Sequence, residues 1–246
     1  MASVVSNKQV MTGTFLMWLE CAGISLEARP GQFVMVHCGE ETVLRRPLSI
    51  HQADGGKFAL LYAIIGKGTQ WLSQCSPGVE VDILGPLGNG FMVYPDSRNL
   101  LLIAGGIGIA PLMSLADRAI SDGRNVILLY GTANKDRYHL PSGVTEVAAT
   151  EDGSIGYKGM ITELVPEHVE WADQIFACGP LPMYRAMAKM SELKNKPVQV
   201  SLEMRMGCGM GTCYACTIRT RQGLKQVCKD GPVFDMNDVI WEEIKT

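Results

Sequence analysis

The sequence lacks the features that mark several large classes of protein. Lysine and arginine number 22 against 25 aspartates and glutamates, so the chain has no basic excess to attract nucleic acid or an anionic membrane surface. No apolar run approaches the roughly 18 residues that a membrane-spanning helix needs. The N-terminus has neither the basic start nor the apolar core of a secretory signal peptide. We therefore expect a cytoplasmic protein that binds neither nucleic acid nor membrane.

Groups for acid–base catalysis are also scarce. The chain has 4 histidines, and they are scattered along the sequence: His37, His51, His139 and His168. The sequence shows neither a Ser/His/Asp triad nor paired carboxylates arranged for acid–base work. We predict structural roles for the histidines and no catalytic residue of this kind in the chain.

The eight cysteines fall into two sets. Four are scattered without a disulfide-like framework, as is typical of a reducing compartment: Cys21, Cys38, Cys75 and Cys178. Four near the C-terminus follow the spacing C-x4-C-x2-C and then x11-C, the pattern of a plant-type 2Fe–2S cluster: Cys208, Cys213, Cys216 and Cys228.

The residues between the C-terminal cysteines suit a loop wrapped around a cluster. Glycines at 207, 209 and 211 let the backbone fold closely enough for its N–H groups to reach cluster sulfurs. Zinc is an alternative, although zinc sites usually repeat a C-x2-C pair and the step from Cys208 to Cys213 is longer. Disulfides or unligated thiols are a further alternative. The spacing favours the iron–sulfur cluster, with these four cysteines as its metal ligands, and indicates an electron-carrying protein.

The chain divides into three parts, which we place at residues 1–95, 96–200 and 201–246. In the first part, short apolar stretches alternate with turns that contain glycine and proline, which predicts a small β-barrel or sandwich. The expected strands lie at 13–20, 32–37, 57–65 and 79–84, with a short helix at 67–75.

The pattern changes at Asn99. Apolar strands are expected at 100–104, 126–130 and 174–177, and helices from the loop after the first strand to about 122 and at 181–193. Apolar strands that alternate with helices predict a parallel sheet covered on both faces, as in Rossmann-like domains. The fold class is therefore an N-terminal β-barrel, a central α/β domain and a small C-terminal cluster segment.

One motif in the β region is a candidate for binding a flavin. Arg46 can reach a pyrophosphate with its planar fork of donors, and Ser49 can hydrogen-bond a flavin ring. Between them lie Pro47 and Leu48. Because Pro47 has no backbone N–H to donate, its position is not expected in the hydrogen-bonded interior of a sheet. Two surface arginines before an edge-strand proline are the alternative that the motif alone leaves open.

A second motif follows on the next strand and helix. Leu61, Tyr62 and Ala63 lie on an expected strand, and Gly68 and Thr69 open the expected helix. Free N–H groups and a hydroxyl at such a position bind anions. An ordinary helix cap is the alternative.

Two elements of the α/β part are candidates for binding a dinucleotide. The loop after the first strand departs from G-x-G-x-x-G, because Pro111 stands where the third glycine would be, and we predict Pro111 as the first helical residue. The second element is a turn at the carboxyl edge of the sheet, where open α/β sheets bind ligands. The alternative for Cys178 in this turn is that it is simply a small buried residue. The candidate residues are Gly105, Gly106, Gly108, Ile109, Ala110 and Pro111 in the loop, and Cys178, Gly179 and Pro180 in the turn.

Together these motifs resemble those of the ferredoxin–NADP reductase superfamily. Its members carry an R-x-x-S-type flavin motif in a β-barrel, a G-G-x-G-x-A-P loop and a C-G-P turn, matched here at 46–49, 105–111 and 178–180. The cysteine-rich segment at 201–217, followed by 227–234, is similar to that of the electron-transfer subunits of class 1B dihydroorotate dehydrogenase. The resemblance covers nearly the whole chain in the same order.

This resemblance implies FAD in the barrel, NAD(H) on the α/β domain and a 2Fe–2S cluster near the C-terminus. Arg46 and the 68–69 turn would bind the FAD pyrophosphate, the other flavin candidates its ring or ribityl chain, and Cys178 would border the nicotinamide. It also implies an FMN-containing catalytic partner that oxidises dihydroorotate to orotate in pyrimidine biosynthesis, in a heterotetramer of two plus two chains. Electrons would pass from FMN through the cluster to FAD and NAD, since a flavin exchanges one or two electrons.

Some features depart from the family pattern or leave alternatives. No carboxylate follows the strand at 126–130 to hold an adenosine ribose. The preference for NAD over NADP is therefore implied by the family resemblance and not by residues of this sequence. Small subunits of sulfide dehydrogenases and NADPH–ferredoxin oxidoreductases share the architecture, so they are the alternative enzyme function. A non-catalytic iron–sulfur protein is an alternative function of a different class. We expect the surface around Met206, Met210 and Tyr214 to contact the partner.

Overall fold

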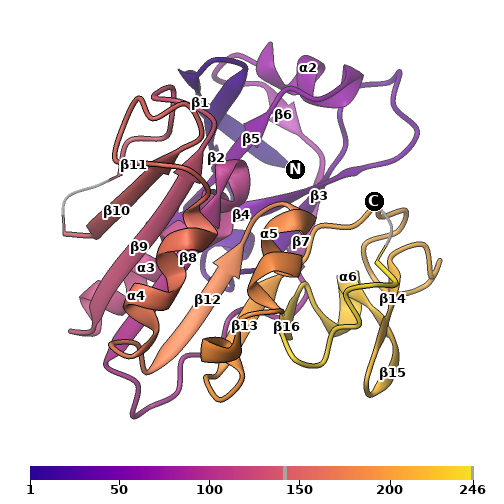
Figure 1. Cartoon of the computed structure of the whole chain (residues 1–246). Helices are drawn as coiled ribbons and strands as arrows, with labels where there is room; N and C mark the ends of the chain where they lie inside the picture. Colours follow the sequence, from indigo (N-terminus) through magenta and orange to yellow (C-terminus); the bar gives the residue numbers. More distant parts are fainter. Residues whose placement is uncertain (141–142, 245–246) are drawn as a thin grey trace.

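The computed structural model describes residues 1–140 and 143–244, so the last two residues of the third predicted part, 245–246, lie outside the described residues. In chain order it contains a β-barrel, a twisted sheet flanked by helices, and a C-terminal segment that lies beside both (Figure 1). The predicted fold class is confirmed. Within the described ranges, no helix is long and apolar enough to cross a membrane.

The barrel is a seven-stranded antiparallel sheet with the order β6-β1-β2-β5-β4-β3-β7. The two edge strands follow each other in the chain with only Asp82 between them, so the sheet curls into a nearly closed barrel. The Asp82 carbonyl accepts a hydrogen bond from the N–H of His37 at 2.9 Å, which extends the pairing of β3 with β7. The strands are β1 (Ala2–Met11), β2 (Thr14–Glu20), β3 (Phe33–Val36), β4 (Arg46–Asp54), β5 (Lys57–Ala63), β6 (Glu80–Val81) and β7 (Ile83–Leu87), with helices α1 (Ala22–Ser25) and α2 (Lys67–Ser73) in the connections.

Three of the expected barrel strands are confirmed as β2, β3 and β5, and the short helix as α2. The single strand expected at 79–84 is wrong, because Asp82 separates two strands that pair with different neighbours, β6 with β1 and β7 with β3. Strand β1 was not predicted. Its outer residues are polar, and pairing with β2, rather than its own pattern, makes it a strand.

Strand β4 changes partners along its length. Residues 50–54 pair with β5, whereas residues 46–49 pair with β3. Pro47 lies in the second stretch, where only one side of the strand has a partner, so its missing N–H breaks no ladder. The flavin motif therefore lies at the point where β4 separates from β5.

The second sheet has the order β11-β10-β9-β8-β12-β13-β16, and all neighbours are parallel except the β13–β16 pair. Its strands are β8 (Asn99–Gly105), β9 (Asn125–Thr132), β10 (Thr145–Thr150), β11 (Tyr157–Lys158), β12 (Gln174–Cys178), β13 (Val198–Ser201) and β16 (Val233–Asp235). The connecting helices are η1 (Gly106–Gly108), α3 (Ile109–Ser121), η2 (Ile161–Leu164), α4 (Val165–Val169), α5 (Leu181–Met187) and η3 (Ser191–Leu193).

Alternate residues of the central strand β8 serve two different cores. Leu100 and Leu102 pack with α3, and Leu61 of the barrel belongs to the same cluster. Leu101 and Ile103 face the opposite side, where α4, α5 and the C-terminal segment cover the sheet (Figure 1). The strand is therefore buried on both faces, as its continuous apolar run predicts.

Two helix predictions in this part are wrong. Helix α3 begins at Ile109 after the short η1, so Pro111 is its third residue rather than its first. A proline in the first turn is still tolerated, since the first N–H groups of a helix have no intrahelical acceptor. The helix expected at 181–193 is interrupted, because α5 ends at Met187 and a separate 3-10 turn, η3, follows.

The C-terminal segment is attached to the α/β sheet by one of its own strands. It contains the hairpin β14 (Thr217–Thr220) and β15 (Gly223–Gln226), then α6 (Val227–Asp230), and then β16, which pairs antiparallel with β13. Its buried residues, among them Cys216, Cys228 and Trp241, share one hydrophobic cluster with α5 and with Phe33 and Met35 of the barrel. The segment is thus packed against both other parts.

Candidate functional site

Three of the C-terminal cysteines lie on one loop and Cys228 lies on α6, and each of the four sulfurs has a backbone N–H directed at it. The N–H groups of Met210 and Thr212 donate to Cys208 Sγ at 3.4 and 3.3 Å, and that of Gly211 donates to Cys228 Sγ at 3.2 Å. The remaining two donors come from the cysteines themselves, Cys208 N to Cys213 Sγ and Cys228 N to Cys216 Sγ, both at 3.4 Å. Donors aimed at sulfur stabilise thiolates and bound clusters, so this loop fits the predicted group.

Glycine is required at two positions of this loop. Gly209 and Gly211 have φ values of +76° and +87°, in the left-handed region that side chains rarely adopt. A Cβ on Gly211 would lie 2.8 Å from the side chain of Lys229, and one on Gly209 would lie 2.4 Å from that of Met35. The backbone therefore approaches its neighbours more closely than any other residue type allows.

The four thiols differ in their surroundings. Hydrogen bonds, that from Thr212 being the largest influence, lower the pKa of Cys208 well below its ordinary value. Burial raises the pKa of Cys228, which is 2% exposed. In the described part of the chain, no three or more Cys, His, Asp or Glu side chains gather closely enough to hold a single metal ion.

The flavin motif faces the C-terminal segment. In an antiparallel pair, directly opposite residues point to the same side. Pro47 lies opposite Met35 and Ser49 opposite Phe33, and both β3 residues belong to the cluster of buried side chains that includes Cys216. Pro47 and Ser49 therefore point out of the barrel, toward the α/β sheet and the cysteine loop. Leu48 points the other way and packs on the barrel core.

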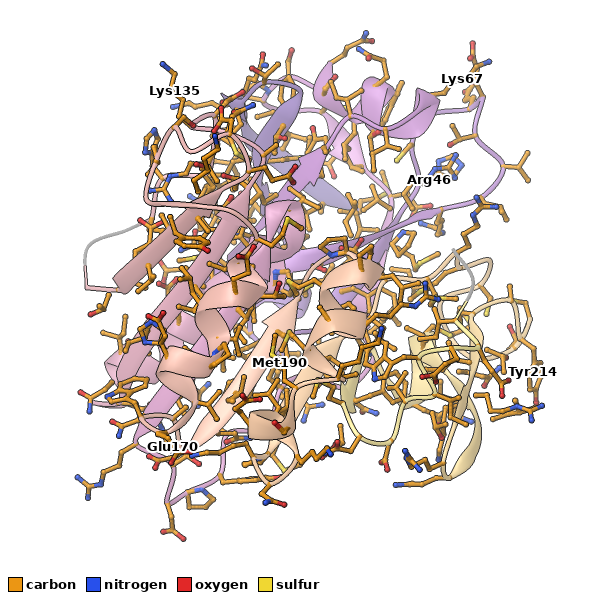
Figure 2. The ribbon with its side chains drawn as sticks, viewed as in Figure 1. Arg46, Lys67, Lys135, Glu170, Met190 and Tyr214 are labelled. Atoms are coloured by element: carbon orange, nitrogen blue, oxygen red, sulfur yellow. The ribbon has the colours of Figure 1, made fainter. Side chains whose placement is uncertain are left out.

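Arg46 is packed against the start of helix α2. A Cβ on Gly68 would lie 3.0 Å from Arg46 Nε and 3.2 Å from Cys38 Cβ, so the guanidinium covers this glycine. Figure 2 shows Arg46 and Lys67 on the same side of the barrel, with Tyr214 of the cysteine loop below them. Arg46 and Gly68, two predicted contacts of one pyrophosphate, are thus neighbours.

Other predicted flavin residues have their side chains engaged inside the protein. Tyr62 is 2% exposed and its hydroxyl donates to Asn7 Oδ1 at 3.1 Å, whereas Leu61 packs toward α3. Thr69 Oγ1 accepts from the N–H of Ile65 at 2.9 Å and so caps α2, with Gly66 as the N-cap residue. Ala63 ends β5. Flavin contacts from Tyr62 and Thr69 stay predictions. Because both side chains are engaged inside the protein, the main-chain atoms of these residues would have to make the contacts.

A pocket of about 500 Å³ lies along the carboxyl edge of the α/β sheet. Each of the six parallel strands contributes at least one residue at or just beyond its carboxyl end: 105–108 at β8, 131–133 at β9, Glu151 after β10, Gly159 after β11, Gly179 after β12 and Glu203 after β13. Open α/β sheets bind their ligands at this edge. The pocket contains the predicted loop residues Gly105, Gly106 and Gly108 and the turn residues Gly179 and Pro180.

The two central glycines of the loop have different reasons to be glycine. Gly106 has a φ of +54°, and a Cβ built on it meets no atom within 4 Å, so it borders open space. A Cβ on Gly108 would lie 2.1 Å from the Cys178 carbonyl oxygen. Gly108 therefore lets the loop contact the strand-end turn, whereas Gly106 leaves room for a ligand. Ile109, Ala110 and Pro111 begin α3 and are buried.

Cys178 lies under the turn rather than in the open pocket. It is 1% exposed, and burial first and the nearby carboxylate of Glu203 second raise its pKa far above the ordinary value. The Tyr184 hydroxyl accepts from the N–H of Gly179 at 2.9 Å and donates to the Ser201 carbonyl at 2.6 Å, which fixes the turn. A contact between Cys178 and a nicotinamide stays a prediction.

Two carboxylates in the pocket were not predicted from the sequence. Glu151 follows β10, and Glu203 follows β13, so the parallel strands bring them to the edge that holds the glycine loop. The surrounding protein raises the pKa of Glu203 by desolvation, although the side chain keeps access to the pocket. By contrast, Asp136 and Arg137 after β9 bind the Thr12 N–H and Glu146, respectively.

The surface expected to contact a partner is only partly as predicted. Met210 is 52% and Tyr214 69% exposed, and Tyr214 adopts a φ of +59° that holds its ring outward on the cysteine loop (Figure 2). Met206 is 9% exposed and belongs to the hydrophobic core, so its place on that surface was predicted wrongly.

Comparison with known proteins gives consistent relatives. Residues 203–240 match a family model described as the iron–sulfur cluster binding domain of dihydroorotate dehydrogenase B. A protein of Clostridium acetobutylicum named dihydroorotate dehydrogenase B (NAD(+)), electron transfer subunit, is 41% identical over 87% of both chains. A protein of the same name from Desulforamulus reducens is 38% identical over 98% of both chains.

Solved structures show the same fold. A chain from a structure described as an NADH-dependent reduced ferredoxin-NADP oxidoreductase superposes with a TM-score of 0.88 at 30% identity, covering 99% of this chain and 91% of its own. A ferredoxin reductase of carbazole 1,9a-dioxygenase superposes with a TM-score of 0.71 at 22% identity, covering 81% of this chain and 67% of its own, a likeness of fold alone.

Proposed function

The chain belongs to the family of electron transfer subunits of dihydroorotate dehydrogenase B. We therefore propose that it carries electrons to NAD from a partner subunit that oxidises dihydroorotate. Its cofactors are FAD, a 2Fe–2S cluster and NAD, in agreement with the family model, the fold and the names of its relatives. The chain is thus an oxidoreductase subunit.

The single observation that carries this proposal is the arrangement of the cysteine sulfurs. Each of the four accepts a backbone N–H, and the segment that bears them, the loop together with α6, packs on the same face of the barrel as Pro47 and Ser49. A one-electron group on this loop and a flavin on this face would be neighbours. Flavins connect one-electron carriers to nicotinamide, which exchanges a hydride.

The residues of the chain would then do the following work. Cys208, Cys213, Cys216 and Cys228 hold the cluster, and their N–H partners stabilise its sulfurs. Arg46, with the turn at Gly68 and Thr69, binds the FAD pyrophosphate, while Pro47, Leu48, Ser49 and residues 61–63 border its ring or ribityl chain.

The nucleotide pocket orients NAD across the sheet edge. The loop at 105–111 receives the pyrophosphate, and the turn at 178–180 borders the nicotinamide. Glu203 lines that end of the pocket, where desolvation raises its pKa above the ordinary value. The chain has no candidate base of its own for removing a proton from dihydroorotate, so that step belongs to the partner.

The partner in this proposal is an FMN-containing dihydroorotate dehydrogenase subunit, in a heterotetramer of two chains of each kind in the cytoplasm. The exposed side chains of Met210 and Tyr214 beside the cysteine loop are the surface that we assign to it. A relay group is useful only near a second redox centre, so the partner has to cover the loop.

Expression of the chain alone and together with such a partner tests the proposal. Alone it should oxidise NADH with artificial acceptors and give no dihydroorotate turnover, and together the two should reduce NAD with dihydroorotate. Oxidation of dihydroorotate by the chain in isolation, or no gain in NAD reduction when the partner is added, would contradict the proposal. A visible spectrum without flavin bands would indicate a non-catalytic iron–sulfur protein instead.

A second function follows from the structural comparison. The chain described as part of an NADH-dependent reduced ferredoxin-NADP oxidoreductase is 30% identical over nearly the whole length. Reduction of ferredoxin by this chain with a partner other than a dihydroorotate oxidase would favour that function, although the higher identity of the curated relatives favours dihydroorotate.

A further inference from the structure

The cysteine loop and the flavin motif are joined by one side chain, that of Met35. This methionine lies on β3, is 0% exposed, and belongs to the hydrophobic cluster that contains Cys216 and Cys228. Its neighbour across the sheet is Pro47 of the flavin motif. It therefore lies in the layer between the two predicted electron-carrying sites.

The contact with the cysteine loop is unusually close. The position of a Cβ on Gly209 lies 2.4 Å from Met35 Cγ and 3.0 Å from Met35 Sδ, with Leu87 Cδ1 at 3.4 Å. The Gly209 backbone thus rests directly on the thioether, one residue after Cys208. Its φ of +76° shows that the loop bends at this point.

The other side of Met35 is fixed by the barrel. Main-chain pairing places Met35 opposite Pro47 on β4 and opposite Leu84 on β7, so β3 has partners on both edges. The side chains of Met35 and Pro47 point to the same side of the sheet, as opposite residues of an antiparallel pair do. A rigid strand therefore supports the methionine on which the loop rests.

We infer that Met35 is a positioning residue that holds the cysteine loop at a fixed separation from the flavin-binding face, and so sets the rate of electron transfer between FAD and the cluster. The inference rests on the proposed function. An unbranched, polarizable side chain fills an irregular gap well and keeps it free of water. Electron transfer between protein-bound groups depends steeply on their separation, so a loss of this contact should act on that step alone.

The test compares Met35→Ala with Met17→Ala in the full chain. Met17 is also 0% exposed on a barrel strand, but it belongs to the barrel core and not to the cluster around the cysteines. FAD and iron content and the thermal midpoint are measured first. The proteins are then mixed with NADH without oxygen, and flavin bleaching and the electron paramagnetic resonance signal of the reduced cluster are followed separately.

Both variants should bleach the flavin at the wild-type rate. Met35→Ala should reduce the cluster about 10-fold more slowly, since small displacements far from the reacting atoms have effects of this size or larger, whereas Met17→Ala should not. Met35→Leu, which keeps the volume, should stay close to wild type. Equal cluster reduction in the two alanine variants would overturn the inference. A wild-type protein without FAD or cluster would instead overturn the proposed function.

A second measurement uses a pair of compensating substitutions and is read from the iron content instead of the rate of cluster reduction. Gly209→Ala should lower the iron content, because the new Cβ collides with Met35 and the backbone is strained at positive φ. Adding Met35→Ala to Gly209→Ala removes the collision and should restore part of the iron and the resonance signal. A double variant that holds no more iron than Gly209→Ala alone would show that Met35 does not set the position of the loop.

Discussion

The imidazole of His51 joins the barrel to the glycine-rich loop through the carbonyl of Ala110. His51 Nδ1 lies 2.9 Å from that oxygen, and Nε2 lies 3.1 Å from the Tyr138 hydroxyl. A carbonyl can only accept, so Nδ1 carries the proton and the neutral ring accepts from Tyr138 at Nε2. The histidine that the sequence marked only as structural thus connects β4 with the first turn of α3.

We predict that this contact makes stability depend on pH. Burial lowers the pKa of His51 to about 4 against an ordinary value of 6.5, with the Ala110 hydrogen bond opposing. As pH falls below 6.5 the unfolded chain binds a proton there while the folded chain does not until about 4. The free energy of unfolding therefore falls in this window, by about 1.4 kcal/mol per pH unit at most.

Urea denaturation between pH 7.5 and 5.5 measures this effect against His51→Gln, which has no such titration. The free energy of unfolding should change more steeply with pH in the wild type than in His51→Gln. The control His139→Gln should behave as the wild type does, since His139 is exposed. Parallel curves for wild type and His51→Gln would contradict the assignment.

Replacing one cluster ligand should remove iron and acid-labile sulfide together. Cys228→Ser should lose both, because its Sγ is one of the four that accept a loop N–H. Cys75→Ser is the control, since Cys75 is also buried but lies just after α2 in the barrel core. If Cys228→Ser kept a full cluster and Cys75→Ser lost it, the ligand assignment would be wrong.

The two adjacent arginines of the barrel should differ in their effect on FAD. Arg46→Ala removes a predicted charge-assisted contact to phosphate, which typically costs about 1.5–3 kcal/mol, or roughly 10- to 150-fold in affinity. Arg45→Ala should leave FAD bound, because Arg45 pairs with Asp82 at 2.5 Å instead. FAD released from purified protein and quantified by fluorescence provides the measurement. Full occupancy in Arg46→Ala would exclude Arg46 from the site.

Substitutions of the two central loop glycines should separate ligand binding from folding. Gly106→Ala points a methyl group into open space beside the pocket and should raise the KM for NADH in diaphorase assays, by roughly 5- to 150-fold if it overlaps the pyrophosphate by about 1–3 kcal/mol. Gly108→Ala should instead lower the thermal midpoint, since its Cβ would overlap the Cys178 carbonyl. Normal NADH kinetics in Gly106→Ala would show that the nucleotide binds elsewhere.

Glu151 should determine the preference for NAD over NADP. With the pyrophosphate on the central loop and the nicotinamide on the β12 side, the adenosine has to lie toward β10, where Glu151 lines the pocket. A carboxylate there can bind the ribose 2′-hydroxyl and repel a 2′-phosphate.

Glu151→Gln should therefore lower the ratio of kcat/KM for NADH to kcat/KM for NADPH by about tenfold, because the variant loses one hydrogen bond to a charged group. Asp152→Asn is the control, because Asp152 accepts from the N–H of Ser154. An unchanged ratio in Glu151→Gln would leave the preference to other residues.

Local patterns in the sequence were enough for the fold class and for the motifs on single loops. The run Leu100 to Ala104 predicts a buried strand, and the three cysteines between 208 and 216, with the glycines beside them, predict one compact loop. Elements whose structure depends on distant partners were missed. Strand β1 has polar residues at many positions and exists through its pairing with β2. The end of α5 has no local sign either, since residues 186–190 contain neither glycine nor proline.

The same limit applies to the site. Glu151 and Glu203 are 52 positions apart in the numbering, and neither belongs to a short motif. They meet at one pocket because β10 and β13 are parallel members of one sheet, which the sequence alone does not order. Met35 is likewise an ordinary strand residue until the cysteine loop is seen resting on it.

The order of the chain has a consequence for how the protein is made. Strand β16, the edge of the α/β sheet, follows all four C-terminal cysteines, and the core residues Val239 and Trp241 come later still. Domains generally fold as the ribosome delivers them, N-terminal parts first. Here the nucleotide sheet stays open at one edge until residues 233–235 have been synthesised. A message that stopped just after Cys228 would encode every thiol of the cluster and still leave the dinucleotide domain without its last strand.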